Sequence, residues 1–590
     1  KNVYELLKDG CGFRVYLGES QQFVGGGDDV KTLTQDVEIG WHTHSYAEVE
    51  GEEYRECACG KTCSHEDGYH NDGTCAVCGK PCPHTNVDKS DYTCKGCGEQ
   101  MSVKIQKQNG SPEYSTDFRA AMGNAEDGTT ITLLADIIME GWNKRAELSG
   151  DGKTVTLDLN GHVLTRKNTD RYDIVIIQSG ATLTLIDSNT GNLQHKFNAG
   201  EGGWTKAADD ATGEGIVTVT GGVIYGDAGS SIDTRGIKIL DGKLEMYGGN
   251  IAGIGNGYTH AYGGGVYVSD KCTFNMYGGS IKGCYVFSDG GGVYVAAGGT
   301  FTMGGDSTIE GCNARSGGGV YNAGTFTMSG NSCIRNCIYR SGAGSGGVHS
   351  AGTFNLNGGS VVRSLSGYND NKELVGICNA GTLNATISVS CWVSNYSIIS
   401  EGTFTGNFSN DSGGTISGGE FQGEVENCAT INGGKFSVGK VRNAGGNIIN
   451  GTFDVPVTND GGWIKGGTFY DTVTNDRSII EGGEFHSTVN NTGEIRGGTF
   501  YRTVTGSGRI NDGAYVTVTF NSDGGTPVEG AKVLRGQKVA KPTDDPTKSG
   551  YTFIGWEDAD GAYDFSKSVI APLTLTAKWE KVPSSGGYYY

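Results

Sequence analysis

The chain has few prolines, no excess of positive charge and no long apolar segment. Only 9 of its 590 residues are proline, and no run of 18 or more apolar residues occurs, so no segment is expected to insert into a membrane. Acidic residues number 66 against 46 basic ones, and the net charge of −20 excludes an electrostatic footprint for nucleic acid. Glycine is abundant at 102 residues, but it follows no Gly-X-Y period, which excludes collagen.

A glycine-anchored repeat occupies the middle of the chain. GGGVYV stands at 263–268 and 290–295, GGGVYN at 317–322 and SGGVHS at 345–350, at intervals of 27, 27 and 28 residues. A strand phrase of the type GTFTM follows each copy, which aligns four phenylalanines in one column: Phe274, Phe301, Phe326 and Phe354. Short alternating strands at such a period, with no amphipathic helix between them, predict a coil that stacks on itself. The expected fold is all-β, a parallel β-helix, right-handed by the crossover rule.

Two further columns follow from the same alignment. Cys284, Cys312 and Cys337 share a column with Ile254, so we expect them to face inward as buried thiols rather than as disulfides. Beside them runs an outward column in which opposite charges can pair across rungs. Its members are Lys282, Glu310, Arg335 and Arg363.

The rung shortens after about Ser400. Aromatic residues then recur every 15 to 17 positions, at Phe404, Phe421, Phe436, Phe453, Phe469, Phe485, Phe500 and Tyr515. Three short strands per turn predict a narrower, triangular solenoid that continues the wide one. A short helix within 118–137 is expected to cap the first rung, because an open end would expose core and unpaired edge.

Eight cysteines lie between Cys57 and Cys97, in phase with histidines. Two complete C-x-H/C-x-x-C units predict closed, structural zinc sites, and a third, degraded unit precedes them. The alternative is four disulfides in a small secreted module. For the degraded unit, which comes first in the chain, zinc binding and disulfides are equally compatible with the sequence. The candidate ligands are Cys63, His65, Cys75 and Cys78, then Cys82, His84, Cys94 and Cys97, and in the degraded unit His42, His44, Cys57 and Cys59.

The C-terminal region breaks the repeat. Its residues Gly550–Trp556, Tyr563–Phe565 and Ala577–Trp579 resemble the Listeria–Bacteroides repeat, also called the internalin B-repeat. The resemblance implies a small β-grasp-like spacer or interaction module on surface proteins of Gram-positive and gut bacteria, without catalytic residues. Trp556 and Trp579 are expected in its core. The central repeats are similar to those of bacterial adhesins and of pectate-lyase-like proteins, a fold that hosts both binding proteins and enzymes.

These patterns divide the chain into six parts. The parts are an N-terminal segment of unclear fold (1–40), the Cys/His-rich segment (41–100), a β-helix with rungs of about 27 residues (101–400), a solenoid with rungs of about 16 residues (401–515), the repeat-like domain (516–581) and a linker (582–590). Both ends look cut from a longer protein, and the terminal SSGGYYY is similar to the stalk before a sortase anchor. The resemblances imply an extracellular location, with cell-wall anchoring through a region outside this chain.

The residue pattern favours a binding protein over an enzyme. No G-x-S-x-G or Ser/His/Asp set occurs, and the acidic residues of the regular rungs do not share one column. The outward column Tyr267, Tyr294, Tyr321 predicts an aromatic strip whose rings could stack on sugars, although tyrosine also simply favours strands. We therefore expect a rigid stalk or adhesin for a glycan or a surface protein, with structural zinc as its only cofactor and self-association left open. The alternative is a polysaccharide lyase or glycosidase.

Overall fold

The computed structural model falls into two units, residues 1–102 with 113–116 and residues 103–112 with 117–590. It describes the backbone of 13–17, 20–24, 46–48, 55–57 and 62–63, and residues 87–94, 99–140, 145–166, 173–189, 191, 193–200, 203–226, 235–256, 262–340, 345–362, 365–366 and 375–583. The first unit holds a hairpin of β1 (Phe13–Leu17) and β2 (Ser20–Val24) and a three-stranded antiparallel sheet of β3 (Tyr46–Glu48), β4 (Arg55–Cys57) and β5 (Thr62–Cys63). β7 (Glu113–Ser115) also belongs to it.

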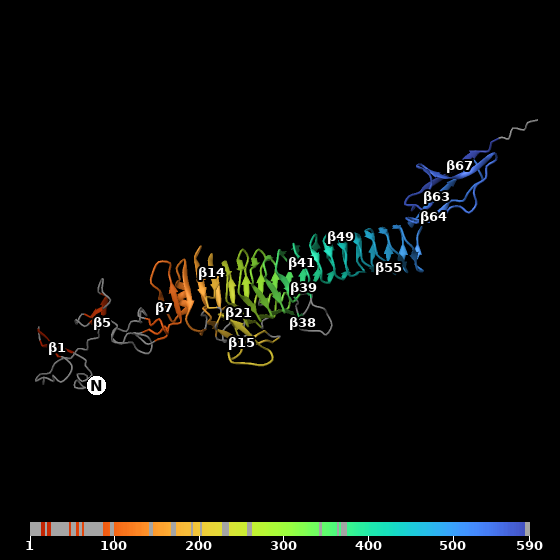
Figure 1. Ribbon diagram of the computed structural model, residues 1–590. Helices are drawn as coiled ribbons and strands as arrows, with labels where there is room; N and C mark the ends of the chain where they lie inside the picture. The colour runs from red at the N-terminus through yellow and green to blue at the C-terminus, as the bar shows by residue number, and fades with distance from the viewer. Residues whose placement is uncertain are drawn as a thin grey trace, which may run out of the picture. The chain divides into compact units, whose positions relative to one another are not determined.

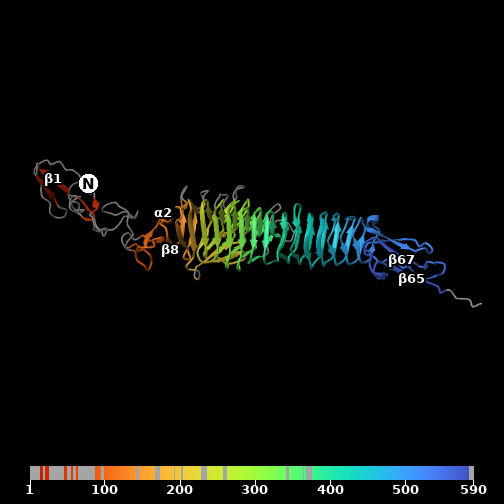
Figure 2. The ribbon, with the colours of Figure 1, turned by 90° about the horizontal axis from the view of Figure 1, so that it is seen from above.

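The second unit is built on a parallel β-helix whose rungs follow one another in chain order (Figures 1 and 2). One sheet runs through all of it with 16 parallel strands. These are β10 (Ala146–Ser149), β13 (Val175–Gln178), β19 (Ile237–Ile239), β23 (Val266–Val268), β27 (Val293–Val295), β31 (Val320–Asn322), β35 (Val348–Ser350), β39 (Val375–Asn379), β42 (Trp392–Asn395), β45 (Phe408–Asn410), β48 (Val425–Asn427), β50 (Val441–Ala444), β52 (Val457–Asp460), β55 (Val473–Asp476), β58 (Val489–Asn491) and β61 (Val504–Thr505).

A second sheet also runs from the wide rungs into the narrow ones. Its strands are β8 (Thr129–Leu133), β11 (Thr154–Asp158), β14 (Ala181–Ile186), β20 (Gly242–Met246), β24 (Thr273–Met276), β28 (Thr300–Met303), β32 (Thr325–Met328), β36 (Thr353–Leu356), β40 (Thr382–Ala385), β43 (Ile398–Ile399), β46 (Thr415–Ile416), β49 (Thr430–Phe436), β51 (Asn447–Phe453), β53 (Trp463–Ile464), β56 (Ile479–Ile480), β59 (Glu494–Ile495) and β62 (Arg509–Ile510).

The wide rungs are closed by two more parallel sheets. The larger contains β9 (Ile137–Met139), β12 (Val163–Arg166), β18 (Val223–Tyr225), β21 (Asn250–Ala252), β25 (Ser280–Lys282), β29 (Thr308–Glu310), β33 (Cys333–Arg335) and β37 (Ser360–Val362). The smaller contains β22 (Gly255–Asn256), β26 (Tyr285–Val286), β30 (Asn313–Ala314), β34 (Ile338–Tyr339) and β38 (Leu365–Ser366).

The narrow rungs have three short strands each, as the sequence predicts. The third strand of each turn comes from β41 (Ser388–Val389), β44 (Thr403–Phe404), β47 (Glu420–Phe421), the second halves of β49 and β51, β54 (Thr468–Phe469), β57 (Glu484–Phe485) and β60 (Thr499–Phe500). The rungs become short earlier in the chain than the spacing of the phenylalanines indicates. Ile377 and Val393, which pair on neighbouring rungs, are already only 16 residues apart. The first short rung has Val389 at the position that Phe404 occupies on the next rung, so the aromatic repeat does not show that this rung is short.

The interior follows the predicted columns. Phe274, Phe301, Phe326 and Phe354 are fully buried, and their ring centroids are 4.8 Å apart from rung to rung. In the narrow part the phenylalanines from Phe404 to Phe500 stack at 4.6–5.1 Å. Tyr515 does not continue this column, because it opens β63 (Tyr515–Asn521) of the C-terminal module and pairs with Leu534. The parallel β-helix is therefore confirmed, and its right-handed sense stays a prediction.

The first rung is capped by the predicted helix, α2 (Phe118–Asn124). The Asp117 carboxylate accepts hydrogen bonds from the backbone N–H groups of Arg119 and Ala120 at 3.0 and 3.1 Å, which begins the helix. Phe118 and Met122 are buried in the solenoid core. β6 (Val103–Gln106) pairs antiparallel with β8 and covers the edge of the first rung.

An excursion between β14 and β18 forms a small antiparallel sheet of β15 (Gln194–Asn198), β16 (Thr205–Lys206) and β17 (Ile216–Thr220). Trp204 from this excursion packs against successive rungs, and its backbone N–H donates to the Gly283 carbonyl at 2.8 Å. A Cβ at Gly283 would lie 2.0 Å from the Trp204 ring, and its φ of +58° also favours glycine. The glycine of the Ile-x-Gly-Cys phrase therefore makes room for this contact, which the repeat alone did not reveal.

Candidate functional site

The predicted zinc ligands lie almost entirely outside the described residues. Of the twelve, only Cys94 has a described side chain; it is buried, and its N–H donates to the Glu99 carbonyl at 2.8 Å. Cys57 and Cys63 are described in backbone only, in β4 and β5. Among the residues that the structure describes, no group of three or more His, Cys, Asp or Glu side chains could hold a metal ion. The zinc segment remains a prediction.

The tyrosine column forms a continuous strip on the first sheet. Centroid distances are 5.3 Å from Tyr267 to Tyr294, 5.2 Å from Tyr294 to Tyr321 and 4.9 Å from Tyr321 to His349, with ring planes within 6° of parallel. All four side chains are half-buried. Because each ring covers the face of the next, the strip presents ring edges and hydroxyls to solvent. The expected stacking of a sugar on a tyrosine face is therefore not what this geometry offers along the strip.

Charged groups flank the strip. The guanidinium carbon of Arg235 lies 5.4 Å from the Tyr267 centroid and Lys238 Nζ lies 5.8 Å from it, so cations cover the ring at that end. Arg315 donates two hydrogen bonds to the buried Asp289 carboxylate, at 3.1 and 2.7 Å. Tyr262 adds a further ring, 4.8 Å from Tyr294.

The environment of the strip shifts the pKa values of its members. Burial, with smaller effects of neighbouring tyrosines and Asp289, raises the pKa of Tyr294 to about 12. Burial also raises the pKa of Tyr321 and lowers that of His349. His349 occupies the tyrosine position of this repeat, and its ring stacks 4.9 Å from that of Tyr321. These shifts favour the neutral forms of Tyr294, Tyr321 and His349, which act as hydroxyl and imidazole partners rather than charges.

The cysteine column lies inside the helix, as expected. Cys284, Cys312 and Cys337 are fully buried free thiols, and burial raises the pKa of Cys312 and Cys337 well above the ordinary value. The outward column beside them pairs as predicted where it is described: Glu310 lies 3.9 Å from Lys282 and 3.0 Å from Arg335. Arg363 is outside the described residues.

A ladder of asparagines runs through the narrow rungs. Each amide nitrogen donates to the side-chain oxygen of the next asparagine at 2.6–2.9 Å, and all members are buried. The members are Asn379, Asn395, Asn410, Asn427, Asn443, Asn459, Asn475 and Asn491. The phrase Val-x-Asn, with phenylalanine in place of valine at Phe408, recurs every 15 to 17 residues from Val393 to Val489, so a periodicity search that included polar residues could have found this ladder.

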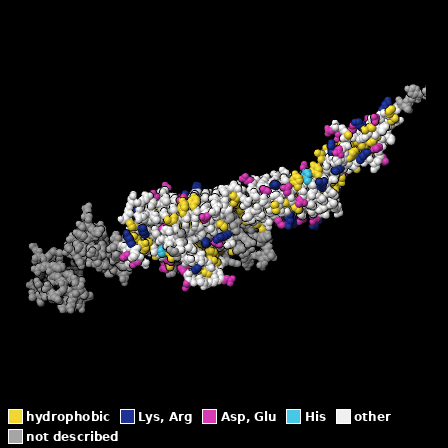
Figure 3. Space-filling view, viewed as in Figure 1, with side chains coloured by type: hydrophobic (Ala, Val, Ile, Leu, Met, Phe, Trp, Pro, Cys, Tyr) yellow, Lys and Arg dark blue, Asp and Glu magenta, His cyan; other side chains and the backbone are white. Residues whose placement is uncertain are grey.

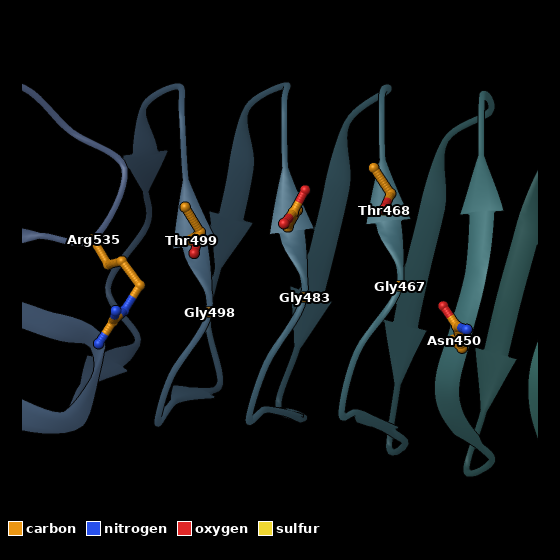
Figure 4. Close-up of a pocket in the computed structure, with 8 residues that line it drawn as sticks. Asn450, Gly467, Thr468, Gly483, Gly498, Thr499 and Arg535 are labelled. Carbon is orange, nitrogen blue, oxygen red and sulfur yellow. The ribbon is translucent and has the colours of Figure 1, made fainter. Parts of the chain in front are cut away.

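The last narrow rungs carry a second aromatic strip and a hollow. Tyr470, His486 and Tyr501 stack at 4.9 and 4.6 Å, and Tyr470 is 54% exposed. Next to this strip is a hollow of about 380 Å³ (Figure 4). It is lined by Asn450, Gly467, Thr468, Gly483, Glu484, Gly498, Thr499 and Arg535. The sequence pattern does not predict this site, because Arg535 belongs to the C-terminal module and comes close to the rungs only in the fold.

The C-terminal module is a five-stranded mixed sheet in the order β64 (Ala531–Leu534), β63, β67 (Leu573–Lys581), β65 (Tyr551–Asp558), β66 (Gly561–Ala562). β63 and β67 are parallel neighbours at its centre. Trp556 lies in the core with Phe520 and Leu575, and the Trp579 indole donates to the Ser522 carbonyl at 3.0 Å. No α-helix occurs among the described residues 515–583, so the β-grasp assignment stays a prediction.

The fold is that of a β-solenoid repeat protein. Residues 517–578 match the family model of the Listeria-Bacteroides repeat domain, which confirms the resemblance seen in the sequence. Such repeats occur in bacterial surface proteins and so indicate a bacterial surface repeat protein. Neither the curated proteins nor the solved structures contain a match to this chain. Among the described residues, no helix has the length and apolar character needed to span a membrane.

Proposed function

We propose that the protein is a rigid extracellular stalk and adhesin, and that it binds glycans through the strip of Tyr267, Tyr294 and Tyr321. The observation that carries the proposal is the register of the strip: parallel strands fix three tyrosines and His349 at nearly equal spacing on one face. Phenol hydroxyls and ring edges suit hydrogen bonds and C–H contacts with a saccharide laid across the rungs.

A binding role without catalysis is consistent with the nearby acids. Asp289 is held by Arg315, and Glu310 by Arg335 and Lys282. Both carboxylates are engaged by cationic side chains, whereas a glycosidase needs a carboxyl group that carries a proton to the leaving group. On the face drawn in Figure 3, acidic and basic side chains are interspersed, a surface that suits neutral or mixed-charge ligands.

Glycan-array binding by the full chain tests the proposal. We expect Tyr294→Ser to reduce binding about tenfold or more, because it removes the central ring and breaks both stacking contacts. Tyr277→Ser is the matched control, since Tyr277 is an exposed tyrosine outside the strip whose ring lies 5.2 Å from that of Tyr247. Equal binding by both variants, or no glycan binding by the parent, would contradict the proposal. Depolymerisation of any bound polysaccharide, lost in Asp289→Asn, would instead assign an enzyme.

A further inference from the structure

The hollow on the last narrow rungs is bounded by side chains from two different parts of the chain. Thr468, Glu484 and Thr499 are paired neighbours on successive strands and form one wall. Asn450 lies at one end and Arg535, from the C-terminal module, at the other (Figure 4). The lining residues therefore come from four successive rungs, which cover about 15 Å along the axis at the usual spacing of parallel strands.

The glycines of this region do not by themselves make the hollow. Gly-Gly pairs also occur at 418–419 and 433–434, which do not line it. Gly483 is required for the interior: its φ is +108°, and a Cβ there would meet the Phe469 and Phe485 rings at 3.2 and 3.3 Å. What distinguishes the last rungs is Arg535, which closes their open end.

The position of Arg535 is fixed by three hydrogen bonds. Its carbonyl accepts from the Phe500 N–H at 2.6 Å, and its N–H donates to the Ala514 carbonyl at 3.0 Å. One guanidinium nitrogen, Nη1, donates to the Ile570 carbonyl at 2.5 Å. Among the described residues no carboxylate pairs with this guanidinium, which keeps further donors for a ligand.

The backbone N–H groups along the wall of the hollow are already hydrogen-bonded within the solenoid. The N–H groups of Glu484 and Thr499 donate to the carbonyls of Gly467 and Gly483, each at 2.8 Å. A peptide could therefore not add to this face as an extra strand. No apolar side chain lines the hollow, so it does not suit a lipid or an amphipathic helix.

We propose that this hollow binds an oligosaccharide that carries a carboxylate at one end. The carboxylate pairs with Arg535, whose planar fork matches it in geometry and charge. The neutral sugars extend along the rungs, where their hydroxyls donate to Glu484 and exchange hydrogen bonds with Thr468 and Thr499. Glu484, 3.7 Å from His486, also disfavours a second carboxylate at the middle of the ligand.

Titration of the full chain with 3′-sialyllactose, and with lactose as the neutral counterpart, tests the site by ligand-observed NMR. The parent should bind sialyllactose at least tenfold more tightly than lactose, because a charge-assisted hydrogen-bond pair corresponds to roughly a tenfold to hundredfold change. Arg535→Gln should remove that preference. Thr499→Val keeps the side-chain shape and leaves the three hydrogen bonds of Arg535 in place. It should weaken the binding of both sugars severalfold.

Arg502→Gln is the matched control, since Arg502 is an exposed arginine of the same rung that does not line the hollow. If Arg502→Gln lost the preference for sialyllactose to the same extent, the preference would come from non-specific charge attraction. If the parent bound the two sugars with equal affinity, Arg535 would have no role in recognising a carboxylate. The absence of saturable binding below about 10 mM would overturn the proposal outright. Tyr294→Ser should leave this binding unchanged, so failure here is distinguishable from failure at the tyrosine strip.

Discussion

The asparagine ladder predicts a large and local loss of stability when one member is truncated. Asn459 is fully buried; it accepts from Asn443 at 2.7 Å and donates to Asn475 at 2.8 Å and to the Gly462 carbonyl at 3.2 Å. Asn459→Ala leaves the Asn475 side-chain oxygen without its ladder donor and one N–H of Asn443 without its acceptor. At about 1–3 kcal/mol for each of these two buried groups, the expected cost is about 2–6 kcal/mol.

Hydrogen exchange measured by mass spectrometry checks both the size and the reach of this effect. Because stability in a solenoid is close to a sum over neighbouring rungs, protection should fall in β50, β52, β55 and their neighbours and stay unchanged in β23–β32. Asn432→Ala is the control, since Asn432 is an exposed asparagine of the same narrow rungs. If Asn459→Ala cost less than about 1 kcal/mol, or matched the control, the ladder would be a passive consequence of the repeat.

Three further results are expected. Phe301→Ala should cost about 3–5 kcal/mol and loosen only neighbouring rungs, measured by the same exchange experiment; a change spread over the whole helix would contradict it. Zinc analysis of protein purified without added metal should give at least two equivalents, and chelation should unfold 41–100 while the β-helix circular dichroism persists; less than one equivalent with eight oxidised cysteines would favour disulfides. Burial lowers the pKa of His349 below its ordinary value of 6.5, so the folded protein resists protonation of this side chain. The contribution of His349 to the free energy of unfolding is therefore complete above about pH 6.5 and is lost as the pH falls below that value. His349→Tyr should therefore reduce the loss of unfolding free energy between about pH 8 and about pH 5.5, and an unchanged loss would exclude His349 as its source.

The rungs could be predicted from the sequence because the same residue types must fill the same interior positions in every copy of the repeat. Val266, Phe274 and Met276 recur at equivalent positions, and parallel pairing places equivalent residues one strand spacing apart. The same parallel pairing places the tyrosines of the strip one strand spacing apart. Identical rings in register at this spacing must cover each other's faces, so the edge-on strip follows from the repeat once the register is fixed.

Contacts between distant segments could not be read in this way. Trp204 reaches Gly283 from an excursion whose strands differ in pattern from the rungs, and Arg535, from a separate module, lines the same hollow as Thr499. The sequence explains each glycine or arginine locally, as a turn residue or a surface charge. Only the fold shows that Gly283 makes room for an indole and that Arg535 ends a hollow.

The ladder also explains how so narrow a coil keeps its register. A one-residue slip of any strand would turn its inward residues outward, and in the first sheet it would separate Asn443 from Asn459 as well as expose Val441 or Val457. Hydrophobic residues alone tolerate exchange between similar columns, whereas a buried amide that loses its partner carries a full desolvation cost. The ladder therefore penalises misregister beyond the loss of apolar burial. A surface that recognises its ligand through side chains on successive rungs, as both proposed sites do, depends on that fixed spacing.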